Sequence, residues 1–386
     1  MTGVDLSTRT RVLVVVEQLR RRVPGGSGTY IAGLLGGLRS LLENTAKNAQ
    51  TTPQVTLSAS RPGGARAARS SQAADPLSRF GFPLDISRLP GPALTRAWSS
   101  GVLRVPASFD VVHSASLAVP RSGRVRTIVT LHDLAWRQVP FAYPRHGRRW
   151  HERTFVWAMQ SRREFVVPSA EVAGQLCEAG VDSTLVNVIE PGGDHLPEPD
   201  VVGADLLLER LGVRGTFILS VGTLEPRKNL AKLALAHEKA RPSLPEGCPL
   251  VVVGPQGWGR GVEPRDGVVL AGPVSDGVLE ALYRRALLLA YVPLLEGFGL
   301  PPLEAMNSGT PVLASRIPSA REAAFVVDPT NVDEMADGLI EVATDESLRG
   351  ELVEAGRARA SLLTWQRCAS KHVELWDARA PRLLAG

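Results

Sequence analysis

The chain has 386 residues, of which 44% are hydrophobic and 22% charged, and its formal net charge is +5. This length predicts about two globular domains, the modest positive charge suits contact with anions, and no apolar run is long enough to span a membrane. Three scattered cysteines argue against a disulfide framework or a zinc cluster and fit a reducing cytoplasm, while an aromatic share of 5% argues against a nucleic-acid binder.

Short runs rich in valine and isoleucine alternate with longer segments of helical period, which is typical of buried parallel strands joined by helices. In the first half, strands are predicted at 11–16, 54–59, 109–113, 126–131, 164–168 and 185–189. In the second half, they are predicted at 216–221, 249–253, 267–271, 288–293 and 311–314. Two such series predict an α/β protein with two Rossmann-like, doubly wound domains facing a central cleft at the carboxyl ends of their strands.

The segment 191–205 is rich in proline, glycine and aspartate and is the predicted hinge. We therefore expect an N-terminal domain over 1–197 and a C-terminal domain over 198–364. A final helix at about 365–386 is expected to pack back on the first domain.

The first candidate site is the glycine-rich turn "VPGGSGTYIAGLL" (23–35), which follows the first strand and opens a helix. A turn of this kind is typical of phosphate binding at a helix N-terminus. It is not the dinucleotide fingerprint, because Ile31 stands where the third glycine would be. A plain tight turn is the alternative.

Histidines follow two of the first-half strands. His132 and Asp133 stand in "VTLHDLAW", where the apolar face of the strand has already ended, so a ring N–H of His132 is free to donate to a ligand hydroxyl in the cleft. His113 also ends a strand and is a weaker candidate. His237 and His372 are expected on helix surfaces, and Ser169 is expected to cap a helix.

A basic cluster lies in "YPRHGRRWHERTFVWAMQ" (143–160). Its members are Arg145, His146, Arg148, Arg149, His151 and Arg153. One interpretation is the charged face of a helix whose other side packs inward. The alternative is an amphipathic patch attracted to an anionic membrane surface, supported by the basic run 20–22.

In the second half, "VGTLEPRKN" begins at the end of a predicted strand, so Arg227 and Lys228 are expected to project into the cleft. Two adjacent cations there would neutralise a diphosphate leaving group. A solvated basic turn is the alternative.

The stretch "EGFGLPPLEA" (296–305) places Glu296 and Glu304 eight positions apart across a sharp bend. Pro301 and Pro302 suit the first positions of a helix, which would put Glu304 in its first turn. An ionised Glu304 is able to accept hydrogen bonds from two adjacent ribose hydroxyls, with the flanking glycines letting a phosphate approach. The alternative is a glutamate that complements the helix dipole beside a solvated Glu296.

Together, "SVGTLEPRKNL" (220–230) and "EGFGLPPLEAMNSGTPVLAS" (296–315) resemble the retaining GT-B glycosyltransferases of family 4. The resemblance covers most of the chain and is strongest over 216–330. It implies transfer of a hexose from a nucleoside diphosphate sugar to an acceptor hydroxyl, with retention of configuration, in cell-envelope glycolipid or polysaccharide synthesis. GDP-mannose is the first donor expected, by resemblance to mannosyltransferase members, and UDP- and ADP-sugars are open alternatives. The family implies no metal and no other cofactor.

The same resemblance implies roles for individual residues. Glu304 binds the ribose, Glu296 and His132 contact the donor sugar, and Arg227 and Lys228 stabilise the leaving diphosphate. The loop amides that approach the donor belong to Gly297, Phe298, Gly299 and Leu300, and the turn that touches the diphosphate and borders the acceptor holds Gly25 and Gly26. Two departures stand out: Thr223 occupies the place where the family often has arginine, and the loop 318–325 is shortened.

These departures keep a second interpretation open, a catalytically impaired GT-B protein with a binding role. An NAD-dependent Rossmann enzyme is a third, although neither half carries G-x-G-x-x-G after its first strand. The expected partners are the nucleotide-sugar donor and an unidentified hydroxyl acceptor, lipid-linked if the basic cluster binds an anionic membrane surface, with no nucleic acid. The expected location is the cytoplasm, either free or peripheral at the inner face of the plasma membrane.

Overall fold

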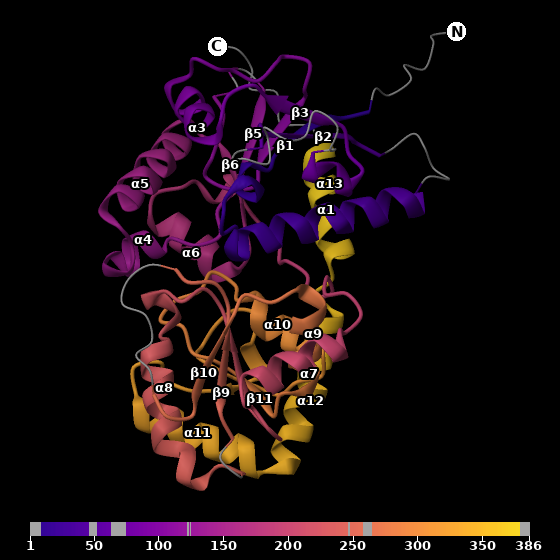
Figure 1. Ribbon diagram of the computed structural model, residues 1–386. Coiled ribbons are helices and arrows are strands. Elements are labelled where there is room, and N and C mark those ends of the chain that lie inside the picture. The colour runs from indigo at the N-terminus through magenta and orange to yellow at the C-terminus, as the bar shows by residue number, and fades with distance from the viewer. Residues whose placement is uncertain are drawn as a thin grey trace. The chain divides into compact units, whose positions relative to one another are not determined.

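The computed structural model describes residues 9–45, 52–62, 75–121, 123, 125–245, 248–257 and 265–378. The chain divides into two compact units (Figure 1). Unit 1 comprises Met1–Leu134, Arg145–Pro191 and Trp365–Gly386. Unit 2 comprises Ala135–Pro144 and Gly192–Thr364.

Unit 1 is built on a seven-stranded parallel sheet with the order β3-β2-β1-β4-β5-β6-β7. Its strands are β1 (Arg11–Val15), β2 (Gln54–Ser60), β3 (Leu84–Ser87), β4 (Val111–Ser114), β5 (Arg126–Thr130), β6 (Glu164–Val167) and β7 (Val186–Val188). In β1 the residues after Arg11 are all buried, as expected for a central parallel strand that is covered on both faces. The sequence did not predict β3, because this half-buried edge strand has only two apolar residues.

The main helices of unit 1 are α1 (Gly25–Thr45), α3 (Gly91–Ser100), α5 (Arg145–Gln160), α6 (Ala170–Glu178) and α13 (Trp365–Asp377). The last helix, drawn in yellow, lies beside the indigo α1 (Figure 1). Two glycines of α1 make this packing close: a Cβ on Gly33 would lie 2.1 Å from the Trp365 ring, and one on Gly37 would lie 2.2 Å from the Trp365 carbonyl oxygen. The part of the predicted final helix beyond residue 378 lies outside the described residues.

Unit 2 is built on a six-stranded parallel sheet with the order β10-β9-β8-β11-β12-β13. Its strands are β8 (Ile218–Val221), β9 (Leu250–Val253), β10 (Val268–Gly272), β11 (Leu288–Tyr291), β12 (Val312–Ala314) and β13 (Phe325–Val326). In β11, Leu289 and Tyr291 join one core cluster while Leu288 and Ala290 join the other, so both faces of the sheet are covered. The two parallel sheets confirm the predicted Rossmann-like α/β fold.

The main helices of unit 2 are α7 (Val201–Arg210), α8 (Leu230–Ala240), α9 (Asp276–Arg285), α10 (Leu300–Asn307), α11 (Val332–Thr344) and α12 (Glu346–Ser361). A short helix, α4 (Ala135–Gln138), also groups with this unit. Helix α7 begins inside the segment that was predicted as a hinge. Within the described residues, no helix has both the length and the apolar character needed to cross a bilayer.

The prediction that His237 and His372 lie on helix surfaces is wrong, because both are fully buried. His237 is bonded through Nε2 to the Cys248 carbonyl at 2.8 Å, and His372 through Nδ1 to the Cys368 carbonyl at 2.8 Å. These contacts let each ring stay neutral inside the protein. Ser169 does cap α6, accepting from the amide of Val172.

His113 is also fully buried and belongs to the interior of unit 1. Its ring stacks on that of His372 at 5.2 Å. Trp376 donates Nε1–H to His113 Nδ1 at 3.2 Å, so His113 carries its proton on Nε2, which contacts Thr130 at 2.8 Å. Nδ1 therefore anchors α13 to the sheet, and Nε2 joins β4 to β5.

Candidate functional site

The strand order of unit 2 brings two loops of the sequence together. Strands β8 and β11 are parallel neighbours, so the loops that follow them leave the sheet at the same edge. The first loop contains Arg227 and Lys228, and the second contains Glu296. The amide of Leu294 donates to the carbonyl of Arg227 at 2.9 Å and joins the two loops directly.

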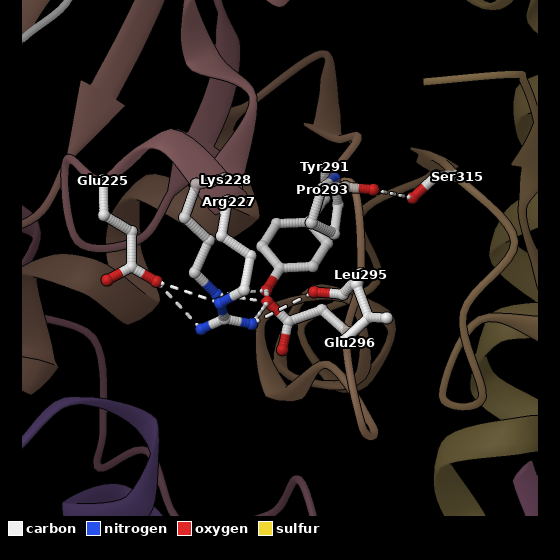
Figure 2. Close-up of polar contacts among 8 residues, drawn as sticks. All are labelled: Glu225, Arg227, Lys228, Tyr291, Pro293, Leu295, Glu296 and Ser315. Atoms are coloured by element: carbon white, nitrogen blue, oxygen red, sulfur yellow. Dashed lines mark hydrogen bonds and ion pairs between the residues drawn. The ribbon is translucent and has the colours of Figure 1, made fainter. Parts of the chain in front are cut away.

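One carboxylate oxygen collects three donors (Figure 2). Glu296 Oε1 lies 2.7 Å from Arg227 Nη1, 2.6 Å from Lys228 Nζ and 3.0 Å from the Tyr291 hydroxyl. Figure 2 shows the second oxygen, Oε2, directed away from both cations. Because the Glu296 side chain is only 11% exposed, this is a nearly buried ion pair rather than a solvated turn.

The two cations are used differently. Arg227 contacts Glu225 through Nε at 3.1 Å and through Nη2 at 2.9 Å, and its Nη1 also donates to the Leu295 carbonyl at 3.1 Å. Lys228 donates to Tyr291 at 2.7 Å and to Glu296, which leaves one of its three N–H groups for a ligand. Lys228 is therefore better placed than Arg227 to bind an added anion.

Charge and burial compete in this cluster. Burial opposes ionisation of Glu296, but the charges of Arg227 and Lys228 outweigh burial and lower its pKa to about 2. For Glu225, burial prevails over the charge of Arg227 and raises the pKa. Glu296 is thus held as an anion near neutral pH, and it balances the two cations that were predicted to project into the cleft.

The loop between Glu296 and α10 needs glycine at one position. Gly299 has φ +91°, and a Cβ there would lie 2.8 Å from Ile317 Cδ1 and 3.0 Å from Ser319 Oγ. The side chain of Phe298 is buried in the core of unit 2, so of this residue only the backbone is available to a ligand. Gly297 is buried as well.

Helix α10 begins at Leu300 and has no side-chain cap. Pro301 and Pro302 occupy its first turn, as predicted, and neither has an N–H. Two of the four amides that a helix N-terminus normally presents are therefore missing here.

Glu304 is the fifth residue of α10, so the prediction that it lies in the first turn is wrong. Its side chain is 6% exposed. The Tyr283 hydroxyl donates to Oε2 at 2.8 Å, and His195 Nε2 lies 3.4 Å from Oε1. Burial raises the pKa of Glu304, and His195 and Tyr283 oppose that effect.

Tyr291 links the two glutamates of the motif. Burial raises the pKa of its phenol well above the ordinary value, and the charges of Glu296 and Glu304 both act in the same direction. Both carboxylates thus act on one phenol in unit 2.

Thr223 follows β8 and packs against the turn after β9: its Cγ2 would lie 2.7 Å from a Cβ on Gly257. Thr223 is uncharged, so no cationic side chain stands where the family often has arginine. The charge near the β8 loop therefore comes from Arg227 and Lys228.

Three predicted site residues belong to unit 1. Gly25 and Gly26 open α1 and are exposed, with nothing within 4 Å of an added Cβ at either position, and Gly25 has φ +60°. His132 Nε2 lies 3.3 Å from the Ala115 carbonyl, and its ring meets that of Tyr30 edge-on at 4.8 Å.

The Ala115 contact fixes the chemistry of His132. A carbonyl only accepts, so Nε2 carries the proton and Nδ1 is a lone-pair acceptor. Burial also lowers the pKa of the ring, which favours the neutral form. The expectation that His132 donates a ring N–H to a ligand is replaced by one in which it accepts.

Sequence reasoning missed the polar partners of these residues. They are Glu225, Tyr291, Tyr283 and His195. Glu225 and Tyr291 had a signal, since each stands close to a predicted site residue at a strand end. Tyr283 and His195 had none, because the fold alone brings them to Glu304. In the described part of the chain, no group of three or more His, Cys, Asp or Glu side chains is arranged to hold a metal ion.

Family comparisons match both halves of the chain. Residues 24–195 match "Glycosyltransferase Family 4", and residues 210–359 match "Glycosyl transferases group 1".

Relatives at moderate identity span most of the chain. A D-inositol 3-phosphate glycosyltransferase of Salinispora arenicola is 31% identical over 330 residues, covering 72% of each chain. An O-antigen chain mannosyltransferase B of Escherichia coli is 28% identical over 268 residues, covering 65% of this chain and 70% of the relative.

Solved structures share the fold at low identity. The HepE protein of Anabaena, solved in complex with UDP and glucose, has a TM-score of 0.65 at 18% identity, covering 96% of this chain and all (100%) of the other. The sucrose-phosphate synthase of Thermosynechococcus elongatus has a TM-score of 0.69 at 18% identity, covering 95% and 98%.

Proposed function

This chain belongs to the family 4 glycosyltransferases, and we propose that it transfers a hexose from a nucleoside diphosphate sugar to an acceptor hydroxyl with retention of configuration. The observation that carries the proposal is the Arg227–Lys228–Glu296 cluster at the edge of the unit 2 sheet. In this cluster, Lys228 keeps one N–H group for a ligand, and Glu296 keeps its second carboxylate oxygen, Oε2.

The leaving diphosphate is assigned to Lys228. Its remaining N–H group donates to a phosphate oxygen, and the charge that develops as the sugar departs is stabilised where little water is present. Arg227 supports this role from behind, because its contacts with Glu225 and Glu296 keep the cluster in place. The N-terminus of α10 adds a favourable dipole for the same anion.

The sugar and the ribose are assigned to the two glutamates. Glu296 accepts a hydrogen bond from a sugar hydroxyl at Oε2 while Oε1 holds the cations. Glu304 accepts from the ribose hydroxyls. In the donor-binding loop, the backbone of Gly297, Phe298, Gly299 and Leu300 approaches the diphosphate, and Thr223 lines the site without adding charge.

In unit 1, His132 accepts a hydrogen bond at Nδ1 from a hydroxyl of the reacting sugar. Gly25 and Gly26 form an exposed turn that admits phosphate or acceptor without steric obstruction. The reaction needs no metal or other cofactor under this proposal. That expectation comes from the family resemblance.

The donor is proposed to be GDP-mannose, in view of the similarity to a mannosyltransferase. UDP-sugars are the second candidate, because HepE was solved with UDP and glucose. The NAD-dependent alternative is left without support by the family assignment. The alternative of a catalytically impaired protein is decided by the calorimetric test given below.

The acceptor is proposed to be lipid-linked, because one face of α5 is basic and exposed. The residues on this face are Arg145, His146, Arg148, Arg149 and Arg153. Phe155 and Ala158 of the same helix are buried, so α5 packs with one side and presents charge with the other. Such a face attracts an anionic membrane surface. Co-sedimentation with phosphatidylglycerol vesicles but not with phosphatidylcholine vesicles is the expected result, and equal binding to both would remove this part of the proposal.

Calorimetry with GDP-mannose, UDP-glucose and ADP-glucose tests the donor assignment. One of the three is expected to bind the intact chain, and Glu304→Ala is expected to lose that binding. Slow hydrolysis of the bound donor should accompany it. Binding without any hydrolysis or transfer would favour the impaired alternative, and no binding of any sugar nucleotide would contradict the proposal.

A further inference from the structure

Glu304 is held by two side chains from separate parts of unit 2. Tyr283 reaches it from α9 and donates to Oε2 at 2.8 Å, and His195 reaches it from the loop before α7, with Nε2 3.4 Å from Oε1. Tyr283 is fully buried, and the His195 side chain is 16% exposed. Each carboxylate oxygen therefore has its own partner.

The loop that carries His195 is anchored against α10. A Cβ on Gly193 would lie 2.6 Å from Leu303 Cγ, so only glycine allows this approach. The amide of Gly193 also donates to the Leu363 carbonyl at 3.1 Å. Leu303, on which Gly193 packs, directly precedes Glu304 in α10. These contacts therefore place His195 beside Glu304.

Other carboxylates near Glu304 make these partners necessary. Asp276 and Glu280 of α9 both raise the pKa of Glu304, in addition to burial. Glu280 is itself occupied, accepting from Arg284 at 2.6 Å and from Ser308 at 2.7 Å. Without Tyr283 and His195, Glu304 would face burial and two like charges with no compensation.

Tyr283 and His195 also leave the Glu304 carboxylate able to accept further hydrogen bonds. A carboxylate has about four lone-pair directions, of which Tyr283 uses one on Oε2 through its hydrogen bond, while His195 lies at ion-pair distance from Oε1. One direction on each oxygen stays available, at a fixed orientation. Two neighbouring hydroxyls of a ribose present donors with matching separation.

We propose that Tyr283 and His195 are positioning residues that hold the carboxylate of Glu304 in one orientation, so that the donor site selects ribonucleotides over 2′-deoxyribonucleotides. The inference rests on the proposed function. Neither residue touches the nucleotide. Their effect on binding passes entirely through the two oxygens of Glu304.

The test is the ratio of affinities for a ribonucleotide and its deoxy form. GDP, UDP and their 2′-deoxy counterparts are titrated calorimetrically into the intact chain. We expect Tyr283→Phe to weaken binding of the preferred ribonucleotide about tenfold, because a hydrogen bond to a charged group is lost. Binding of the 2′-deoxy form should change about twofold at most, since it gains less from an ordered Glu304.

Variants at His195 show whether its ring acts as a donor to Glu304 or only packs against its neighbours. His195→Gln keeps an N–H near the same place and should retain the preference for ribose, whereas His195→Leu should lose it. Ser308→Ala is the matched control, since it perturbs the neighbouring Glu280 without removing a partner of the Glu304 carboxylate. Its affinity ratio should equal that of the unmodified chain.

Failure of this inference is distinguishable from failure of the proposed function. If Glu304→Gln abolishes the ribose preference while Tyr283→Phe and His195→Leu leave it intact, the positioning role is overturned and the donor site stands. If the unmodified chain shows no ribose preference, or binds neither nucleotide, the assignment of Glu304 itself is wrong.

Discussion

Lys228 Nζ lies 2.6 Å from Glu296 Oε1, and the two side chains form a nearly buried ion pair at the carboxyl edge of the unit 2 sheet. Arg227 shares the same oxygen at 2.7 Å. The cations assigned to the diphosphate are thus neutralised by the protein before any ligand arrives. A bound phosphate adds negative charge to a cluster that is already balanced, so its binding depends on the spare N–H of Lys228.

The first prediction concerns removal of the shared carboxylate charge. Glu296→Gln should lower the free energy of unfolding by about 3 kcal/mol, because Lys228 and Arg227 lose their common counterion in a partly buried place. Added nucleoside diphosphate should restore more stability to this variant than to the unmodified chain. Denaturant titration with and without nucleotide measures both effects.

The matched control for that variant is Glu238→Gln. Glu238 pairs with Arg265 at an exposed site, where an ion pair contributes at most about 1 kcal/mol. If Glu296→Gln were no less stable than Glu238→Gln, the cluster would not be the balanced unit described above.

The second prediction separates Lys228 from Arg227. Lys228→Met should reduce turnover of the donor about a hundredfold or more, because a donor to the leaving group is lost. Arg227→Met should reduce stability more than Lys228→Met does, since Arg227 bridges Glu225, Glu296 and the Leu295 carbonyl. Equal losses of turnover at equal stability would show that the two cations act alike.

The third prediction concerns the backbone of the donor loop. Gly299→Ala should destabilise the chain by about 1 to 3 kcal/mol, because its φ of +91° is strained for alanine and the new Cβ meets Ile317. Nucleotide affinity should fall as well. Gly36→Ala, at an open position of α1, is the opposite case and should stabilise by about 0.5 to 1 kcal/mol. A neutral Gly299→Ala would contradict the loop geometry.

The fourth prediction is a loss of stability in mild acid. Burial lowers the pKa of His372 to about 4, and it lowers that of His113 well below its ordinary value. The unfolded chain takes up protons near pH 6.5, whereas the folded chain does not until much lower pH. Stability is therefore full above about pH 6.5 and falls as the pH drops toward 4, by at most about 1.4 kcal/mol per pH unit for each histidine.

Unfolding measured between pH 7.5 and 5 checks this prediction. Glu296, with a pKa of about 2, does not contribute in this range. Tyr30, which contacts His372 Nε2 at 3.1 Å, and His132 lie beside the histidine pair. His372→Gln should flatten the dependence on pH, whereas His146→Gln, at an exposed position, should leave it unchanged. A flat profile for the unmodified chain would contradict the neutral packing of the pair.

Features that depend on local sequence were predictable. The apolar runs of β1 and β11 are buried on both faces and have no alternation, so both strands were recognised. The edge strands β3 and β13 were not, because they bury little and are short, whereas the edge strands β7 and β10 were predicted. The bend from Glu296 to α10 was found because its glycines and prolines have local conformational causes.

Features that depend on tertiary contact were not predictable. Glu304 was singled out, but Tyr283 and His195 come from separate elements and carry no spacing signal. His372 was placed on a surface because Ser370, Lys371 and Glu374 surround it in the sequence. The helical spacing of His372 from Trp365, Cys368, Ala369 and Trp376 does indicate a buried face, which the prediction overlooked, but no periodicity reports the stacking on His113.

The most direct measurement is a crystal structure of this chain with its preferred sugar nucleotide. We expect a phosphate oxygen within hydrogen-bonding distance of Lys228 Nζ, both ribose hydroxyls on Glu304, and a sugar hydroxyl on Glu296 Oε2. A nucleotide bound elsewhere, or one whose ribose leaves Glu304 in contact with Tyr283 and His195 alone, would contradict this expectation.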